Sequence, residues 1–130
     1  MMKELCEAYL GALNEGDLDR VLSLFTEGAV VSSPLYGEIP ATVFYKDLFA
    51  DTRKSETTLL HVFTPTDDSS SVALHFHYAW TLQSGSVVDF ECVDVFDVSL
   101  DDRKFTKLCI IYDTYPLRDE HSKSRSTNNG

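Results

Sequence analysis

Cysteines and basic residues are scarce in this chain of 130 residues. The three cysteines, Cys6, Cys92 and Cys109, are odd in number and have no CxxC spacing, so they indicate neither a disulfide framework nor a zinc knuckle. The 11 lysine and arginine residues are outnumbered by 21 aspartate and glutamate residues, which gives a formal net charge of -10. That charge would repel phosphate backbones and anionic lipids, and we therefore expect no nucleic-acid and no membrane partner.

Long apolar runs and phosphate-binding loops are also missing. The first residues, MMKELCEAYLGALNEG, include acidic residues where a secretory leader needs an unbroken apolar run, and no stretch approaches the roughly 18 apolar residues of a transmembrane helix. A cytoplasmic location is the default expectation. The chain has neither a glycine-rich phosphate loop nor a GxSxG elbow, so nucleotide chemistry and covalent serine chemistry have no basis here.

The sequence does contain enough apolar residues for one core, since 43% of its residues are hydrophobic and 12% are aromatic. Helical spacing of these residues predicts helices over 2–14, from Leu18 to Gly28, and from Pro40 onward, with a short strand at 29–33. Alternation then predicts strands over 56–64, 72–82, 87–98 and 105–115. Short turns between these strands favour an antiparallel meander, and helices followed by strands are typical of an α+β domain. We assign this domain to residues 1–115 and interpret the polar residues 116–130 as a mobile C-terminal tail.

A carboxylate interrupts the apolar face of the strand 87–98. The even positions of this strand are apolar except for Asp94, whereas the odd positions carry Asp89, Glu91 and Asp97. A buried carboxyl group has a raised pKa, and its neutral form can donate a hydrogen bond to a substrate oxygen. The alternative is a structural Asp94 that is hydrogen-bonded to backbone or to a buried hydroxyl group.

Two further groups are candidates for proton transfer. Asp113 is in phase with Phe105 on the last strand and is expected at the pocket rim, with a strand-end role as the alternative. Glu56 could orient His61 as a general acid or base, although their spacing of five residues requires a bend or bulge before they can meet.

The strand 72–82 has two unlike faces. His75 and His77 share one face, and Leu74, Phe76, Tyr78 and Trp80 share the other. We expect the second face to line the core or pocket and the first to form an oligomer surface. No third ligand with suitable spacing accompanies the histidines, so no metal site is predicted.

The segment YLGALNEGDLDRVLSLFTEGAVVSSP, residues 9–34, resembles the opening of ketosteroid isomerases and SnoaL-like cyclases of the NTF2-like superfamily. The later VDVFDV and YD elements extend the similarity to about residues 5–115. The resemblance implies a cone-shaped NTF2-like fold, with three N-terminal helices packed on a curved, mainly antiparallel sheet that encloses a pocket. It also implies a homodimer.

The resemblance implies roles for particular residues. Tyr9 matches the oxyanion-hole tyrosine of ketosteroid isomerases, and Asp94 matches the aspartic acid partner of that tyrosine, which stays protonated because it is buried. Ser33 stands before Pro34 where those isomerases have their general-base aspartate, so this chain departs from their mechanism. Asp113 matches the acid/base aspartate of SnoaL-like cyclases.

The Glu56-x4-His61 arrangement is similar to that of fungal meroterpenoid isomerases, which rearrange lactone and ester rings without a cofactor. The resemblance therefore implies a cofactor-independent isomerase or cyclase that acts on an apolar polycyclic polyketide or meroterpenoid. Residues expected around the substrate are aromatic side chains and two loop residues: Phe44, Tyr45, Phe63, Phe90, Phe96, Tyr36 and Arg53. The alternatives are a non-catalytic ligand-binding or dimerisation module of the same fold and, less favoured, an epoxide hydrolase or dehydratase.

Overall fold

The computed structural model describes residues 2–115, 121 and 124. Its helices and strands follow one another as α1 (Met2–Glu15), α2 (Leu18–Ser23), β1 (Phe25–Ser33), β2 (Gly37–Pro40), α3 (Ala41–Asp51), β3 (Thr52–Phe63), β4 (Ser71–Leu82), β5 (Val87–Ser99) and β6 (Lys104–Ile111). The α+β class is confirmed. The helices do not all precede the sheet, because β1 and β2 lie between α2 and α3.

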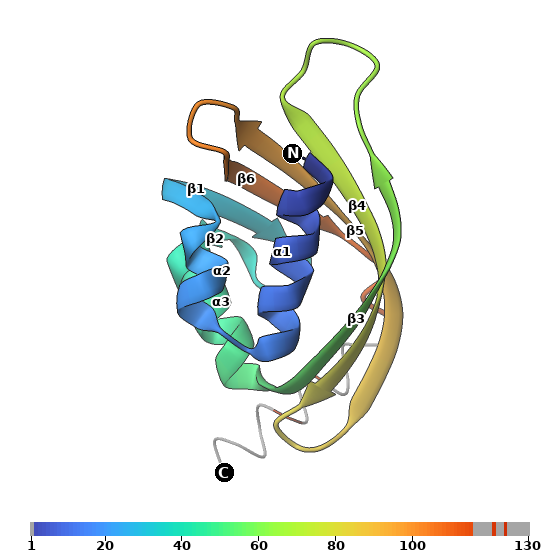
Figure 1. Cartoon of the computed structure of the whole chain (residues 1–130). Coiled ribbons are helices and arrows are strands. Elements are labelled where there is room, and N and C mark those ends of the chain that lie inside the picture. The colour runs from blue at the N-terminus through green and yellow to red at the C-terminus, as the bar shows by residue number, and fades with distance from the viewer. Residues whose placement is uncertain (1, 116–120, 122–123, 125–130) are drawn as a thin grey trace.

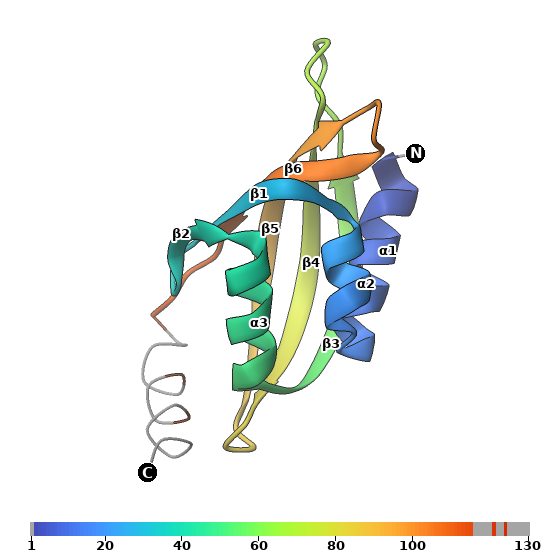
Figure 2. The same cartoon turned by 90° about the vertical axis from the view of Figure 1, so that its left-hand side faces the viewer.

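The strands form one six-stranded sheet with the order β2-β1-β6-β5-β4-β3. All neighbouring pairs are antiparallel except β1 and β6, which run parallel. The sheet is strongly curved, and the three helices lie on its concave side (Figures 1 and 2). No helix among the described residues is both long enough and apolar enough to cross a membrane.

The first strand begins earlier than the sequence predicts. Asp17 caps α2, with its side chain accepting a hydrogen bond from the Arg20 backbone N–H, but the helix ends at Ser23 rather than at the predicted Gly28. Phe25 then pairs with Phe105, and the Phe105 N–H donates to the Leu24 carbonyl oxygen at 2.8 Å. Phe25 therefore pairs with a distant strand, although its spacing fits a helix. The sequence analysis predicted neither this parallel pair nor β2.

Two bulges change which side chains face the helices. In β3 the register shifts between Leu59 and His61, and in β6 it shifts between Phe105 and Lys107. An extra residue in one strand reverses the alternation of all side chains beyond it. The bulges therefore decide on which face His61 and the end of β6 lie.

Candidate functional site

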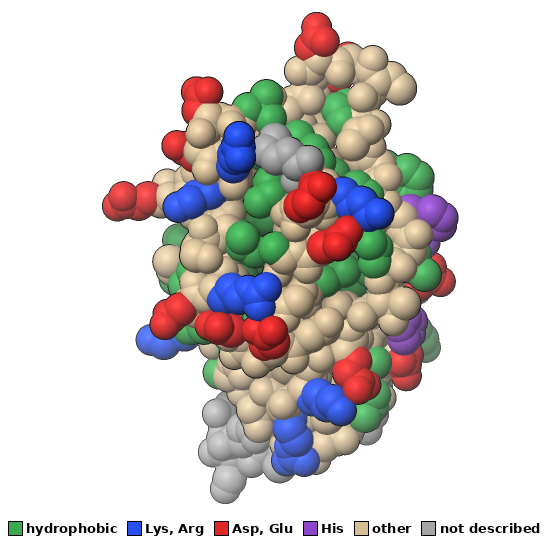
Figure 3. Space-filling view, in the orientation of Figure 1, with side chains coloured by type: hydrophobic (Ala, Val, Ile, Leu, Met, Phe, Trp, Pro, Cys, Tyr) green, Lys and Arg blue, Asp and Glu red, His purple; other side chains and the backbone are tan. Residues whose placement is uncertain are grey.

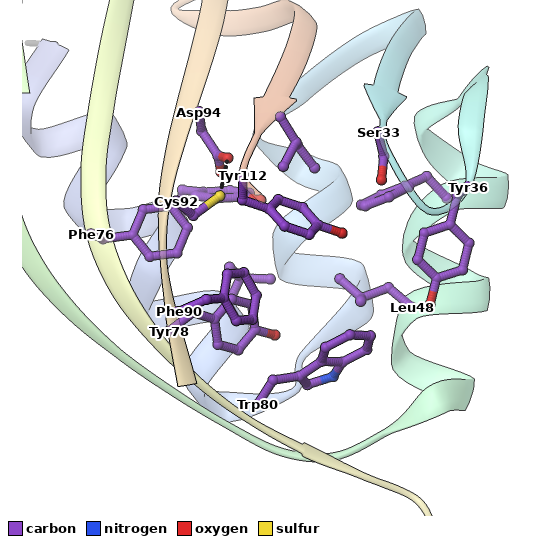
Figure 4. Close-up of a pocket in the computed structure, with 14 residues that line it drawn as sticks. Ser33, Tyr36, Leu48, Phe76, Tyr78, Trp80, Phe90, Cys92, Asp94 and Tyr112 are labelled. Atoms are coloured by element: carbon purple, nitrogen blue, oxygen red, sulfur yellow. Dashed lines mark hydrogen bonds between the residues drawn. The ribbon is translucent and has the colours of Figure 1, made fainter. Parts of the chain in front are cut away.

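A small cavity lies between the helices and the concave face of the sheet (Figure 4). Its volume is about 40 Å³. One water molecule needs roughly 10–15 Å³ on this measure, whereas pockets for drug-sized ligands span about 300–1,000 Å³. A cavity of this volume holds a few waters and no polycyclic molecule. The residues that line it are Tyr9, Leu13, Ser33, Tyr36, Phe44, Leu48, Phe76, Tyr78, Trp80, Phe90, Cys92, Asp94, Ile110 and Tyr112.

Asp94 is the one carboxylic acid in this lining, and only 1% of it is exposed. Burial raises the pKa of its carboxyl group to about 7, although hydrogen bonds from Cys92 and Tyr9 favour the ionised form and lower the pKa in part. The Cys92 thiol donates to Asp94 Oδ1 at 3.1 Å, and burial raises the pKa of that thiol, so it remains a donor. A large fraction of Asp94 is therefore neutral near pH 7.

Tyr9 connects Asp94 to a second buried tyrosine. Its hydroxyl lies 2.7 Å from the Tyr45 hydroxyl, and either oxygen can be the donor. Burial raises the pKa of both phenols, which keeps them protonated. When Tyr45 donates to Tyr9, the Tyr9 hydrogen is directed to another acceptor, either Asp94 or a ligand oxygen. The arrangement can supply two neutral donors, a phenol and a carboxylic acid, to one oxygen atom.

Further hydroxyl groups surround the cavity. Tyr78 lies 2.8 Å from Ser55 Oγ, and Tyr112 is hydrogen-bonded to Ser33. Burial raises the pKa of both phenols, so they stay neutral in the physiological range. The sequence analysis predicted that Tyr78 lies on a core or pocket face but did not name it as a site residue. It did not identify Tyr112, because the β6 bulge reverses the alternation of side chains there.

Only some of the aromatic residues that were predicted to contact the substrate line the cavity. Phe44, Phe90 and Tyr36 line the cavity. Tyr45 and Phe96 are buried behind its lining, with Phe96 stacked on Phe105 at a ring-centroid distance of 3.9 Å.

Phe63 and Arg53 do not line the cavity. Phe63 is 55% exposed at the end of β3. The Arg53 guanidinium donates to the Gln83 carbonyl oxygen at 2.7 Å, which holds it beside the β4–β5 turn.

Glu56 and His61 lie on the convex, outer face of the sheet. Each stands opposite an outward-facing residue of β4, since Glu56 pairs with Ala79 and His61 with His75. The β3 bulge does bring the two onto one face, but four ladder positions still separate them, about 13 Å at strand spacing. Glu56 forms an ion pair with Lys54 at 3.0 Å instead. The predicted contact between Glu56 and His61 is therefore not made.

His61 belongs to a different polar group on that outer face. Its Nδ1 lies 3.1 Å from His75 Nδ1, and His75 Nε2 lies 2.8 Å from Glu91 Oε1. The two imidazole planes are within 4° of parallel. Within the part of the chain that the structure describes, no group of three or more His, Cys, Asp or Glu side chains is placed to hold a metal ion.

Asp113 is exposed just beyond the end of β6. The prediction that it shares a face with Phe105 is wrong, because the β6 bulge turns Ile110 and Tyr112 toward the cavity instead. Asp113 Oδ1 accepts a hydrogen bond from the Tyr115 N–H at 3.0 Å. This is the strand-end arrangement that the sequence analysis kept as the alternative.

A buried polar cluster beside the cavity escaped the sequence analysis. Tyr36 donates to Asp51 Oδ2 at 2.6 Å, and His121 Nε2 lies 3.2 Å from the same carboxylate oxygen and 3.2 Å from the Tyr36 hydroxyl. Asp51 and His121 are almost fully buried. His121 stands in a polar segment that has no periodic pattern, so only the presence of a histidine there could have drawn attention to it. Of residues 116–130, only His121 and Ser124 are within the described part of the structure, and the rest of the predicted tail lies outside it.

Charged side chains are interspersed on the face that carries the helices. In the space-filling view acidic and basic groups alternate with hydrophobic patches, and histidines appear at the edge beside β3 (Figure 3). The described residues form no continuous basic patch on this face.

Comparisons with known proteins identify relatives at the level of family and fold. The model of the SnoaL-like domain matches residues 6–107. A search of proteins with curated functions finds no match. PrhC from Penicillium brasilianum has a TM-score of 0.78 at 11% identity, with 98% of this chain and 89% of that chain covered.

Two bacterial structures also share the fold. A protein from Catenulispora acidiphila with a ketosteroid isomerase-like fold, solved in complex with trimethylamine, has a TM-score of 0.76 at 10% identity, with 92% of both chains covered. A protein from Shewanella denitrificans that is provisionally named a SnoaL-like polyketide cyclase has a TM-score of 0.71 at 15% identity, with 94% of this chain and 96% of that chain covered. At these identities the likeness establishes a shared fold.

Proposed function

Since the chain belongs to the SnoaL-like domain family, we propose that it is a cofactor-independent isomerase or cyclase acting on a polycyclic polyketide or meroterpenoid intermediate. The observation that carries the proposal is Asp94, a buried carboxyl group with a pKa of about 7 in an apolar cavity beside a protonated tyrosine. Fold similarity to PrhC and to the Shewanella protein supports this choice of reaction class.

The proposed chemistry uses Asp94 and Tyr9 as hydrogen-bond donors. A substrate carbonyl oxygen would lie against the neutral Asp94 carboxyl group and the Tyr9 hydroxyl. The described lining holds no second carboxylate and no imidazole, so solvent hydroxide takes the proton from the neighbouring carbon and becomes water. The carbonyl oxygen becomes an enolate oxygen, and the two donors stabilise its charge more than they stabilise the neutral carbonyl. Bond reorganisation and return of the proton then give an isomer of the same mass. The acid/base roles of Glu56, His61 and Asp113 stay predictions, and none of these three residues lines the cavity.

Purified protein incubated with panels of polycyclic polyketides and terpenoid lactones is expected to give products of unchanged mass without an added cofactor. In D2O, proton abstraction beside the carbonyl adds deuterium to the product, which liquid chromatography with mass spectrometry detects. Tyr9→Phe and Asp94→Ala are each expected to lower kcat by about 100-fold to 1,000-fold, the usual loss on removing one oxyanion-hole donor. Val43→Ala, an exposed change on α3 outside the cavity, is the control.

Full turnover in both cavity variants would contradict the proposed roles of Tyr9 and Asp94. Turnover that requires an added nicotinamide, flavin or metal ion would contradict the cofactor-independent class as a whole.

A non-catalytic ligand-binding or dimerisation module is the second candidate function. The volume of about 40 Å³ favours the dimerisation role, and the hydrogen bond that the Asp94 carboxyl group already accepts from Cys92 favours a non-catalytic protein of either kind. This candidate predicts saturable binding of a cavity ligand with no change in its mass, isotope content or connectivity. The D2O experiment separates the two functions directly.

We also infer that two copies of the chain associate through the outer face of the sheet, which carries the exposed side chains Phe63 and Ile111. Size-exclusion chromatography with light scattering is expected to give twice the mass of one chain. Ile111→Asp is expected to give the monomer mass, because it places a charge on this apolar surface. Val43→Asp changes a similarly exposed residue of α3 and should leave the dimer intact. A wild-type protein that stays monomeric at all concentrations would overturn the inference.

A further inference from the structure

A surface groove lies between the end of α1 and the start of β3 (Figure 1). Its volume is about 300 Å³, several times that of the cavity beside Asp94. Residues 13–16 of α1 and the loop after it form one side of the groove, and residues 52–55 of β3 form the other. The groove and the cavity together reach the lower end of the roughly 300–1,000 Å³ that pockets for drug-sized ligands span.

The groove and the cavity share one wall. Leu13 lines both. Beside Leu13, Ser55 Oγ in the groove lies 2.8 Å from the hydroxyl of Tyr78, which lines the cavity. Trp80 Nε1, on the cavity side, donates to Thr52 Oγ1 in the groove at 2.7 Å. The wall is therefore one layer of side chains thick, and it closes the end of the cavity that is remote from the carboxylic acid (Figure 4).

Leu13 is the part of this wall that packing alone holds in place. Its side chain has no polar atom, whereas the residues beside it are joined by hydrogen bonds. A change of the leucine rotamer therefore opens a gap in the wall without breaking a hydrogen bond. Leu13 stands one helical turn beyond Tyr9 on the buried face of α1, so a group that passes Leu13 comes next to the Tyr9 hydroxyl.

Arg53 gives the groove a positive charge. Its guanidinium group donates to a carbonyl oxygen of the β4–β5 turn at 2.7 Å, and no carboxylate of the described residues pairs with it. The other two charged residues that line the groove are in ion pairs. Glu15 pairs with Arg20 at 2.6 Å, and Lys54 pairs with Glu56 at 3.0 Å. Most N–H donors of Arg53 thus remain for a ligand, and the turn holds them in position, which lowers the entropy cost of binding.

We propose that the groove binds the carboxylate of an amphiphilic ligand through Arg53, while the apolar part of the same ligand passes Leu13 into the cavity. In this position the carboxylate keeps its contact with water, and the apolar part leaves water. The inference rests on the proposed function in one respect, that the cavity receives the reacting part of the ligand. It makes the substrate an organic acid, and it explains how a cavity of about 40 Å³ can serve a larger molecule.

Calorimetric titration of the full-length protein with cyclohexylbutyrate and with the neutral cyclohexylbutanol tests the groove. The wild type is expected to bind the acid about tenfold more tightly than the alcohol, as one charge-assisted hydrogen bond at an exposed site allows. Arg53→Gln should remove this difference, and Arg53→Lys should keep part of it. Arg103→Gln makes the same change in the β5–β6 turn, outside the groove, and should leave the difference intact.

Nuclear Overhauser effects between cyclohexylbutyrate and the wild-type protein test the passage past Leu13. The cyclohexyl protons are expected to contact the methyl groups of Leu48 and Ile110, which line the cavity and not the groove. Contacts confined to Leu13 would overturn the passage. Equal affinity for acid and alcohol, an unchanged preference in Arg53→Gln, or no saturable binding of the acid at millimolar concentration would overturn the carboxylate site. These measurements involve no turnover, so a protein without the proposed isomerase activity can still pass them, and their failure leaves the D2O experiment unaffected.

Discussion

Replacing Phe96 with alanine is expected to lower the free energy of unfolding by about 3–5 kcal/mol, the usual cost of truncating a fully buried phenylalanine. Phe96 has no exposed surface and packs against Phe105, Tyr9 and Phe25. These rings connect α1, β1, β5 and β6, so the cavity left by the truncation lies where four elements meet. Domains are stable by only about 5–15 kcal/mol, and the variant is therefore expected to be only marginally folded.

Urea unfolding followed by circular dichroism measures this loss. Phe63→Ala is the matched control, because it removes the same atoms from a side chain that is 55% exposed. Exposed substitutions usually change stability by no more than about 0.5 kcal/mol. A similar loss in both variants would contradict the assignment of Phe96 to the core, and loss of ligand binding at unchanged stability in Phe96→Ala would restore the predicted contact with substrate.

The elements of this fold were predictable where a local pattern determines them. Alternating side chains define β4 and β5 to within one residue of the predicted 72–82 and 87–98, because β4 carries an unbroken apolar face toward the helices. The buried position of Asp94 follows from the same alternation. The outer position of His61 and the exposure of Asp113 did not follow, since each depends on a single extra residue in its strand, and nothing local to the sequence marks Leu60 or Thr106 as that residue.

Long-range partners limited the prediction in other places. Phe25 fits the apolar stripe of a helix, yet it pairs with a residue 80 positions later in the chain. Asp51 and His121 are 70 residues apart, and each alone is a common surface residue. Their pairing depends on a long-range contact between α3 and His121 that neither residue signals locally. The apolar walls of the candidate site could thus be anticipated, whereas its second polar cluster could not.

Replacing Asp94 with asparagine is expected to stabilise the protein at pH 8 while removing its acidic group. The Asp94 pKa rises from an unfolded value of about 3.9 to about 7 in the folded protein, first of all because burial penalises the charge. Between those two values the folded state binds a proton that the unfolded state has lost. The stabilising effect of this proton is complete below about pH 4 and disappears as the pH rises through about 7.

The asparagine side chain has the shape of the neutral acid and never ionises. The stability of the variant relative to wild type should therefore grow by about 1.4 kcal/mol per pH unit between about pH 4 and 7, and by about 4 kcal/mol in all. Other titrating groups contribute equally to both proteins and cancel in the difference. Urea unfolding of both proteins from pH 4.5 to pH 8.5 measures the difference in their free energies of unfolding. Asp97→Asn, on the exposed side of the same strand, is the control.

Parallel stability curves for Asp94→Asn and wild type would mean that Asp94 is ionised throughout this range. A neutral carboxylic acid would then not be present near pH 7, and Asp94 could not donate a hydrogen bond to a substrate oxygen. The predicted divergence, in contrast, would establish that the protein gives up several kcal/mol of stability above pH 7 to keep an acid inside its core. A group that destabilises the fold in this way is better explained by ligand binding or catalysis than by packing, because asparagine would fill the same space without the penalty.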